Sequence, residues 1–232
     1  MKKIALIISL VALFAINANA QQKKSVFGLK FGPNVGWASA GSTATSSDHP
    51  RLGFVVGGIH DRYLSDHVAL SSGINLNLLR MDYTFEDYRA TSEFLEVAKL
   101  PVHRRFKGSY IEVPLKLKVK VDVSGSWKAF AEAGVGFSWN YATKTKDSYR
   151  DLFDALYEDN SFSNDYFYQY RWIQSALNFG VGAMFEVNSK FNLFAQLTFN
   201  HALSNSFNKA IEQQTGSIIR TNFIGLEVGI SE

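Results

Sequence analysis

The stretch Ile111–Val121, IEVPLKLKVKV, is followed at residues 127–139 by WKAFAEAGVGFSW, and both alternate between apolar and polar or small side chains. In the first run every odd position is aliphatic, whereas the even positions hold Glu112, Pro114 and three lysines. A strict two-residue period over this length is typical of a β-strand whose two faces meet different environments. The chain is therefore predicted to be built from amphipathic strands.

The same alternation recurs along the chain and predicts eight strands. Most are longer than the roughly five or six residues usual in globular sheets, and they match the roughly 9 to 11 residues of a tilted membrane strand. We expect strands at residues 27–37, 53–63, 68–78, 111–121, 129–141, 173–187, 191–203 and 223–230.

The second of these strands is ambiguous in phase. We assign Val55, Ile59 and Tyr63 to its apolar face, because the other choice places His60 and Arg62 there.

The connections between the predicted strands alternate between long and short. Outer-membrane barrels have short periplasmic turns and longer extracellular loops. The alternation of long and short connections, together with the even number of strands, predicts an all-β, eight-stranded antiparallel transmembrane up-and-down β-barrel. Both termini would then be periplasmic. The long connections are 38–51, 82–109, 142–171 and 204–217, and the short ones are 64–66, 123–126 and 188–190.

A soluble eight-stranded barrel would show the same alternation with its apolar face turned inward. The glycines favour the membrane barrel, because they share the polar face, and a narrow lumen needs small residues. Tryptophans 37, 127, 139 and 172 lie at predicted strand ends, where aromatic girdles sit. The glycines concerned are Gly28, Gly32, Gly36, Gly134, Gly136, Gly180 and Gly182.

Residues 1–20, MKKIALIISLVALFAINANA, have the features of a secretory signal peptide: two lysines, a short apolar stretch and Ala18-Asn19-Ala20. We expect residues 21–232 to form a single outer-membrane β-barrel domain, exported through the general secretory route. Without the two leader lysines the chain has 22 basic and 21 acidic residues, so no nucleic-acid partner is indicated.

The composition excludes further classes. The chain has no cysteine, which excludes disulfides, thiolate metal sites and cysteine nucleophiles. Its 46% hydrophobic content is too high for a disordered chain.

The register of the hairpin formed by residues 111–121 and 127–139 follows from which residues have odd and which have even numbers. Val121 and Ala129 both face lipid, so directly opposed residues share odd or even number. A loop centred on Gly125 satisfies this rule and opposes opposite charges, whereas a two-residue Ser124-Gly125 turn needs a bulge. The predicted pairs are Asp122 with Lys128, Lys118 with Glu132 and, around a turn centred on Ser189, Glu186 with Asn192.

Charges on the polar face are nearly balanced. Because eight strands leave an interior just filled by side chains, we expect these charges to pair in a closed lumen. They are Lys30, Lys116, Lys118, Lys120 and Lys128 against Glu112, Glu132, Glu186 and Glu227.

Histidines are candidate catalytic bases. His201 and Ser204 are similar to the His-x-Ser-Asn motif of outer-membrane lipid A deacylases, but one residue too far apart to share a strand face. Asp48 and His49 are typical of a turn. We predict no catalytic, cofactor-binding or metal-binding residues, and no cofactor.

The third long connection, SYRDLFDALYED at 148–159, has helical spacing and a capping-box pattern at Ser148 and Asp151, which predicts a short helix. Eight aromatic residues in this loop suggest either a partner-binding surface or rings packed over the barrel mouth. They are Tyr149, Phe153, Tyr157, Phe162, Tyr166, Phe167, Tyr168 and Tyr170.

YIEVPLKLKVKV at 110–121 with WKAFAEAGVGFSW at 127–139 resembles the central hairpin of the PorT-like small outer-membrane β-barrel family. Residues 53–78, 178–187 and 195–205 resemble its other repeating features. The resemblance implies an eight-stranded barrel in a Gram-negative outer membrane and a link to a protein secretion machine.

The sequence thus predicts a non-enzymatic outer-membrane barrel with a closed lumen. It would act through its extracellular loops or as a partner of an envelope or secretion assembly, in contact with outer-membrane lipid. A lipid-modifying barrel enzyme and a small channel are the alternatives.

Overall fold

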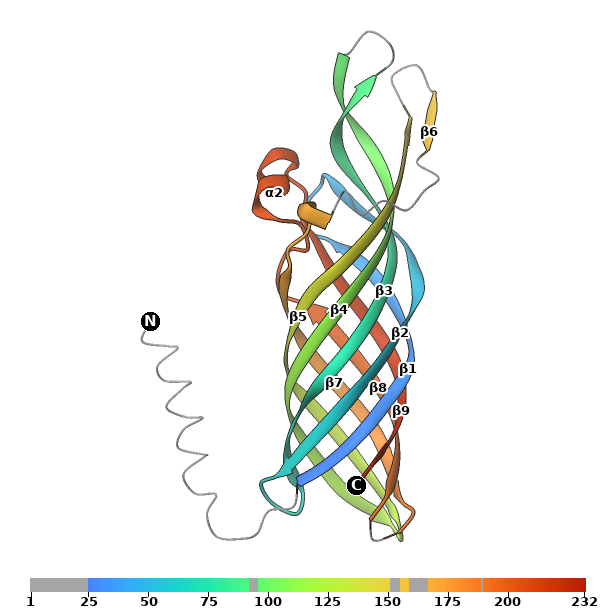
Figure 1. Ribbon diagram of the computed structural model, residues 1–232, viewed down its shortest axis with the longest axis vertical. Helices are drawn as coiled ribbons and strands as arrows, with labels where there is room; N and C mark the ends of the chain where they lie inside the picture. The colour runs from blue at the N-terminus through green and yellow to red at the C-terminus, as the bar shows by residue number, and fades with distance from the viewer. Residues whose placement is uncertain (1–24, 92–95, 151–154, 159–166, 189) are drawn as a thin grey trace, which may run out of the picture.

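The structure is a computed structural model that describes residues 25–91, 96–150, 155–158, 167–188 and 190–232. The predicted signal peptide lies outside these residues. Eight long strands pair antiparallel with their neighbours, and β1 pairs with β9 to close the ring (Figure 1). The strands of the ring are β1 (Ser25–Ala40), β2 (Thr45–Tyr63), β3 (Val68–Thr91), β4 (Glu96–Ser124), β5 (Trp127–Arg150), β7 (Ile173–Glu186), β8 (Asn192–Ala202) and β9 (Ile219–Ser231).

The outer wall of the barrel is apolar, and the lumen face is polar. Leu117 is 49% exposed whereas its neighbour Lys118 is 3% exposed. This polarity is the reverse of a soluble barrel, and it confirms the predicted eight-stranded antiparallel membrane barrel. Trp127 is exposed at the start of β5 and Trp172 just before β7, whereas Trp139, predicted at a strand end, is exposed midway along β5, which continues to Arg150.

The predicted phase of β2 was wrong. Val55 and Ile59 are buried in the lumen, and Phe54 and Val56 face outward. Ile59 packs in the lumen with Phe130, Met184 and Phe194. His60 lies instead on the outer wall, stacked on Phe27 with ring centroids 4.5 Å apart.

The predicted register of β4 and β5 is confirmed. Asp122 lies opposite Lys128 and Lys118 opposite Glu132, and Glu186 lies opposite Asn192 at the next hairpin. The turn itself differs from the prediction, because Ser124 pairs with Trp127. A bulge at residue 123 then returns the opposed residues to the same odd or even number, as in the pair of Asp122 with Lys128. Ser189 lies outside the described residues.

The predicted connections at 38–51 and 82–109 are mostly strand. β3 and β4 continue past the barrel as a tall hairpin, and β5 runs beside it (Figure 1). We call this end of the barrel the loop end and the opposite end, where the short connections lie, the turn end.

The predicted helix at 148–159 was wrong where the structure describes it. β5 continues to Arg150, and β6 (Leu156–Glu158) pairs with it. Tyr149 and Tyr157 are opposed across this pair, with stacked rings 5.3 Å apart. This cross-strand contact outweighs the local helical spacing; residues 151–154 lie outside the described residues.

The helix at the loop end is α2 (Lys209–Thr215), which the sequence analysis did not anticipate. The side chain of Asn208 caps it by accepting from the Ile211 amide at 2.9 Å, and Gly216 ends it with a φ of 70°. The 3₁₀ turn η1 (Phe167–Gln169) leads into Tyr170, which bridges to Phe207.

Candidate functional site

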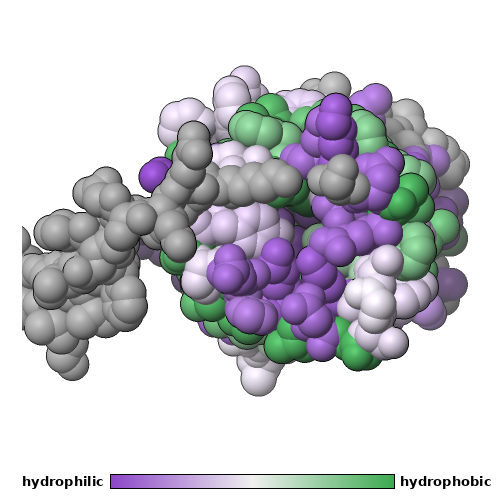
Figure 2. Space-filling model, turned by 90° about the horizontal axis from the view of Figure 1, so that it is seen from below, coloured by the Kyte–Doolittle hydropathy of each residue, from purple (hydrophilic) through white to green (hydrophobic). Residues whose placement is uncertain are grey.

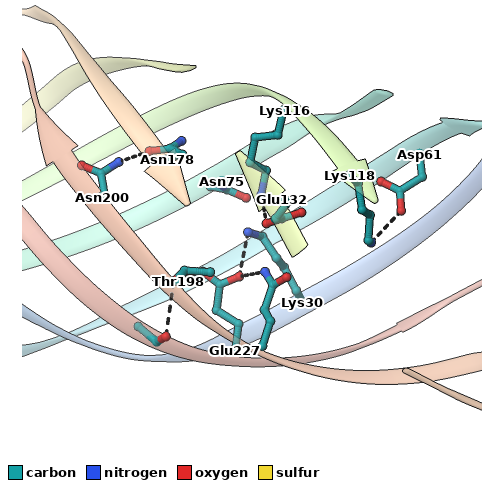
Figure 3. A network of polar contacts seen from close by, with 12 residues as sticks. Lys30, Asp61, Asn75, Lys116, Lys118, Glu132, Asn178, Thr198, Asn200 and Glu227 are labelled. Atoms are coloured by element: carbon teal, nitrogen blue, oxygen red, sulfur yellow. Dashed lines mark hydrogen bonds and ion pairs between the residues drawn. The ribbon is translucent and has the colours of Figure 1, made fainter. Parts of the chain in front are cut away.

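Ion pairs between neighbouring or nearby strands occupy the middle of the lumen (Figure 3). Lys30 of β1 donates to Glu227 of β9 at 2.8 Å, and Lys118 of β4 donates to Asp61 of β2 at 2.8 Å. Lys116 pairs with Glu132. All six side chains are nearly inaccessible, so each charge depends on its partner.

The pairing differs in detail from the expectation. Lys118 lies opposite Glu132 in the strand register, yet its ammonium pairs with Asp61. Glu132 pairs instead with Lys116, its diagonal neighbour on β4. Asp61 was missed because the phase assigned to β2 turned it outward. At the turn end Lys128 pairs with Glu186 and lies 3.8 Å from Asp122.

Glu112 is held by amides instead of by a cation. Its two carboxylate oxygens accept from the amide nitrogens of Asn75, Asn77, Asn178 and Asn200, at 2.7 to 3.3 Å. These asparagines come from three strands: Asn75 and Asn77 lie on β3, whereas Asn178 of β7 and Asn200 of β8 lie on the other side of the lumen. The carboxylate therefore links opposite walls of the barrel.

Glycines on the lumen face make room for these groups. A Cβ added at Gly180 would lie 2.8 Å from the Glu132 side chain, and one at Gly136 would lie 2.5 Å from Oε1 of Glu112. The glycines were therefore correctly predicted to serve a crowded lumen.

The loop end of the lumen is filled by a different cluster, which we call the plug. Arg104 is fully buried, and its Nε and Nη2 donate to the two oxygens of Asp147, both at 2.6 Å. Its Nη1 donates to Gln169 and Tyr170, at 2.7 and 3.2 Å. Around it pack buried apolar and aromatic side chains, among them Met81, Tyr83, Phe85, Val102, Phe106 and Phe207.

The plug lies beyond the membrane-facing band, since Arg104 is seven residues along β4 from Ile111, the partner of Trp139. The Tyr83 and Tyr170 hydroxyls are hydrogen-bonded to each other. Burial raises the pKa of the Tyr83 phenol well above its usual value, and burial also raises the pKa of Tyr170. Both phenols are therefore neutral at physiological pH.

Two lumen cavities of about 20 Å³ each lie between these groups. One is lined in part by Tyr110 and Gln174, and the other in part by Lys30 and Glu112. A cavity of that size has room for about one water molecule.

The turn end is open. A vestibule of about 1010 Å³ is lined there by residues that include Tyr63, Lys120, Lys128 and Glu186. Figure 2, which views this end, shows hydrophilic side chains gathered over its middle and hydrophobic ones around them. Lys120 lies over the ring of Tyr63, with its nitrogen 4.0 Å from the centroid.

The aromatic residues of the third long connection do not form one surface. Tyr170 is buried in the plug, Tyr149 and Tyr157 stack on the extended sheet, and Tyr168 is 82% exposed. Phe153, Phe162 and Tyr166 lie outside the described residues. Rings packed over the barrel mouth are therefore confirmed for Tyr170.

The structure does not join His201 and Ser204. The Ser204 hydroxyl accepts from the Ser175 amide at 3.2 Å, and the His201 ring stacks with Phe199. This geometry gives the hydroxyl no imidazole base.

A histidine cluster that sequence reasoning missed lies on the outer wall at the loop end. His103 Nδ1 is 2.7 Å from Asp48 Oδ2, and Thr84 donates to the same oxygen at 2.8 Å. An activated nucleophile would donate to an imidazole nitrogen that a carboxylate supports from the other side. Here Thr84 Oγ1 is 3.5 Å from His103 Nδ1, but both groups meet the Asp48 carboxylate at shorter distances, so the imidazole is not placed to take the hydroxyl proton.

Among the described residues, no group of three or more His, Asp or Glu side chains is placed to hold a metal ion. Within the same part of the chain, no helix is both long and apolar enough to cross a membrane.

Solved structures similar to this chain are membrane barrels of low sequence identity. Neisserial surface protein A is 14% identical with a TM-score of 0.42, over 88% of this chain and 95% of that one. A major outer membrane protein from Thermus thermophilus is 12% identical with a TM-score of 0.42, over 90% and 98%. The outer membrane protease OmpT from Escherichia coli is 9% identical with a TM-score of 0.41, over 92% and 99%.

A comparison with curated proteins found no match. A family model described as the outer membrane protein beta-barrel domain matches residues 19–208, which is most of the chain. The chain therefore belongs to this family, and its location is the outer membrane.

Proposed function

We propose that this protein is a non-enzymatic outer-membrane barrel with a closed lumen, which works through contacts made by its loop end. The observation that carries the proposal is the packing of the lumen. Buried ion pairs occupy its middle, the Arg104–Asp147 plug fills its loop end, and the cavities between them are of about 20 Å³.

The closed lumen is tested by conductance. Purified protein is inserted into planar lipid bilayers, with a general porin as the positive control. We expect no single-channel steps from this protein, because a hydrated path would have to cross the buried ion pairs. Reproducible steps from the native sequence would make it a channel.

We also propose that the loop end faces the exterior and that both termini are periplasmic, as expected for short turns on the periplasmic side. Because the chain has no cysteine, single cysteines can be introduced without background labelling. Tyr168→Cys lies at the loop end and Lys190→Cys at the turn end, and both sites are exposed. A membrane-impermeant maleimide should label only Tyr168→Cys on intact cells, and both variants after lysis.

The resemblance to PorT-like barrels supports a partner in an envelope or secretion assembly. We expect such a partner to bind the part of β3, β4 and β5 that extends beyond the barrel at the loop end (Figure 1). Co-purification from native outer membranes should identify the partner. Removing residues 86–101, the tip of the β3–β4 hairpin, should abolish co-purification while the barrel still folds.

A further inference from the structure

One of the two small cavities, of about 20 Å³, lies inside the barrel between the plug and the asparagines that hold Glu112. Tyr110 and Phe223 line it and belong to the packed cluster of the plug. Asn77 and Asn200 also line it, and both donate to the Glu112 carboxylate. The cavity is therefore placed where the packed loop end meets the polar middle of the lumen.

Three polar atoms on residues that line this cavity have no hydrogen-bond partner among the described residues. They are Oδ1 of Asn77, the hydroxyl of Tyr110 and Nε2 of Gln174. The three residues are 2%, 2% and 5% exposed, so bulk solvent does not satisfy these atoms. A buried polar group without a hydrogen bond is costly, and such a group calls for a partner.

The strand register brings these side chains to the same space. Asn77 of β3 and Tyr110 of β4 lie directly opposite each other. Gln174 of β7 lies opposite Ser138 of β5, which also lines the cavity. Directly opposed residues have their Cβ atoms roughly 4.5 to 5.5 Å apart. One small molecule in the cavity can therefore contact side chains from both sides.

The three atoms are suited to water. The Asn77 oxygen accepts a hydrogen bond, the Gln174 nitrogen donates one, and the Tyr110 hydroxyl can do either. A buried water needs roughly 10 to 15 Å³ of free volume and about two to four polar partners, and this cavity supplies both. A metal ion does not fit the same set, because the Gln174 nitrogen is a donor and not a ligand.

We propose that one water molecule is bound in this cavity as a structural part of the barrel. It donates to Asn77 Oδ1, accepts from Gln174 Nε2 and is hydrogen-bonded to the Tyr110 hydroxyl. Because the Asn77 amide nitrogen donates to Glu112 at 2.7 Å, the water completes a chain of hydrogen bonds from the plug to that carboxylate. The site goes beyond the proposed function, since a single bound water neither opens the lumen nor requires a partner protein.

The direct test is a crystal structure of the native barrel at a resolution that reveals other buried waters. We expect one peak of electron density about 2.7 to 3.2 Å from each of the three atoms. An empty cavity would overturn the proposal. Contacts of about 2.3 to 2.6 Å, which are typical of a calcium ion, would overturn it as well.

The substitution Tyr110→Phe distinguishes a hydrated cavity from a dry one by the sign of its effect. In a dry cavity the hydroxyl is unsatisfied, so its removal leaves the unfolding equilibrium constant unchanged or lowers it. With water bound, the same substitution breaks a hydrogen bond and deprives the water of a partner. We then expect the unfolding equilibrium constant, measured in urea from lipid vesicles, to rise roughly 3- to 10-fold.

The matched control is Tyr141→Phe, the same change at an exposed position on the outer wall. It should leave the unfolding equilibrium constant unchanged within roughly twofold. If Tyr110→Phe does not fold, Gln174→Met removes a different partner of the same water and is judged by the same criterion. A Tyr110→Phe variant at least as stable as the native chain would show that the cavity is dry.

Discussion

Lys118 and Asp61 illustrate how the barrel tolerates charge in its interior. Each is nearly inaccessible, and their side chains meet at 2.8 Å. The Lys118 ammonium also lies 4.4 Å from the centroid of the Phe130 ring. A buried pair of this kind adds little net stability, yet each charge is costly without the other.

Replacing one partner should therefore be worse than replacing both. Lys118→Met should lower the free energy of unfolding by about 3 to 5 kcal/mol, because it leaves Asp61 buried and unpaired. Lys118→Met/Asp61→Leu should recover most of that loss. Urea unfolding from lipid vesicles measures both, and a double variant no more stable than the single one would contradict the argument.

On the outer wall a new charge is destabilising, and the loss of stability depends on how deep in the lipid-facing band the residue lies. Leu117→Arg places a charge in the middle of the lipid-facing band and should cost about 2 to 4 kcal/mol. Val123→Arg, at the turn end of the same strand, should cost about 0 to 1 kcal/mol. The two variants carry the same new side chain, so equal losses in the same unfolding assay would mean that the band is misplaced.

At the scale of elements, the β4–β5 turn depends on Gly125, whose φ is +53°. A β-branched residue is strained there, so Gly125→Val should destabilise the protein by about 1 to 2 kcal/mol. Gly125→Asn should cost less, because asparagine enters this region more readily. A Cβ at this position meets no atom within 4 Å, which leaves backbone strain as the cause. Unfolding in urea compares the variants, and equal stability of all three would exclude strain at this turn.

The strands and the β4–β5 register could be predicted from sequence, because a two-residue period and a parity rule are local properties. The phase of β2 could not. Ile59 is inward because Phe130, Met184 and Phe194 meet it from three other strands, and no pattern within residues 53–63 records those partners.

The candidate site, like the fold, could be predicted from the sequence only in part. Alternation alone predicted the lumen charges except Asp61, which the wrong phase of β2 turned outward. It did not predict Arg104, because the partners Asp147, Gln169 and Tyr170 are 43 to 66 residues away. Likewise, the residues at 148–158 have helical spacing but become strand, because β5 extends beyond the barrel and β6 pairs with it. Contacts between residues far apart in the sequence therefore determine the structure of these segments.

For the whole molecule, the buried phenols predict how stability changes with pH. The folded pKa values of Tyr83 and Tyr170 are raised above the unfolded value of about 10. The folded state therefore holds more protons above that pH, and the stability from burying neutral phenols is lost as pH rises beyond about 10.

Unfolding free energies between pH 9 and pH 12 test this. Tyr83→Phe/Tyr170→Phe should lose less stability over the interval than the native chain does. The contradictory outcome would be parallel curves for the two proteins.

The closed ring should also resist detergent. In SDS without heating, the folded barrel should migrate differently from the boiled chain, because the continuous hydrogen-bonded wall survives at room temperature. Electrophoresis of boiled and unboiled samples measures this directly. Identical migration of the two would indicate that the ring does not persist without the bilayer.

The pair Lys30 and Glu227 joins β1 to β9 across a sequence separation of 197 residues. The seam that closes the ring therefore forms only after the last strand has been made, so insertion must follow translation. Until β9 arrives, seven strands would present two open edges to lipid, where unpaired backbone groups are costly. A chain ending before Ile219 should accordingly remain outside the membrane and depend on chaperones or be degraded.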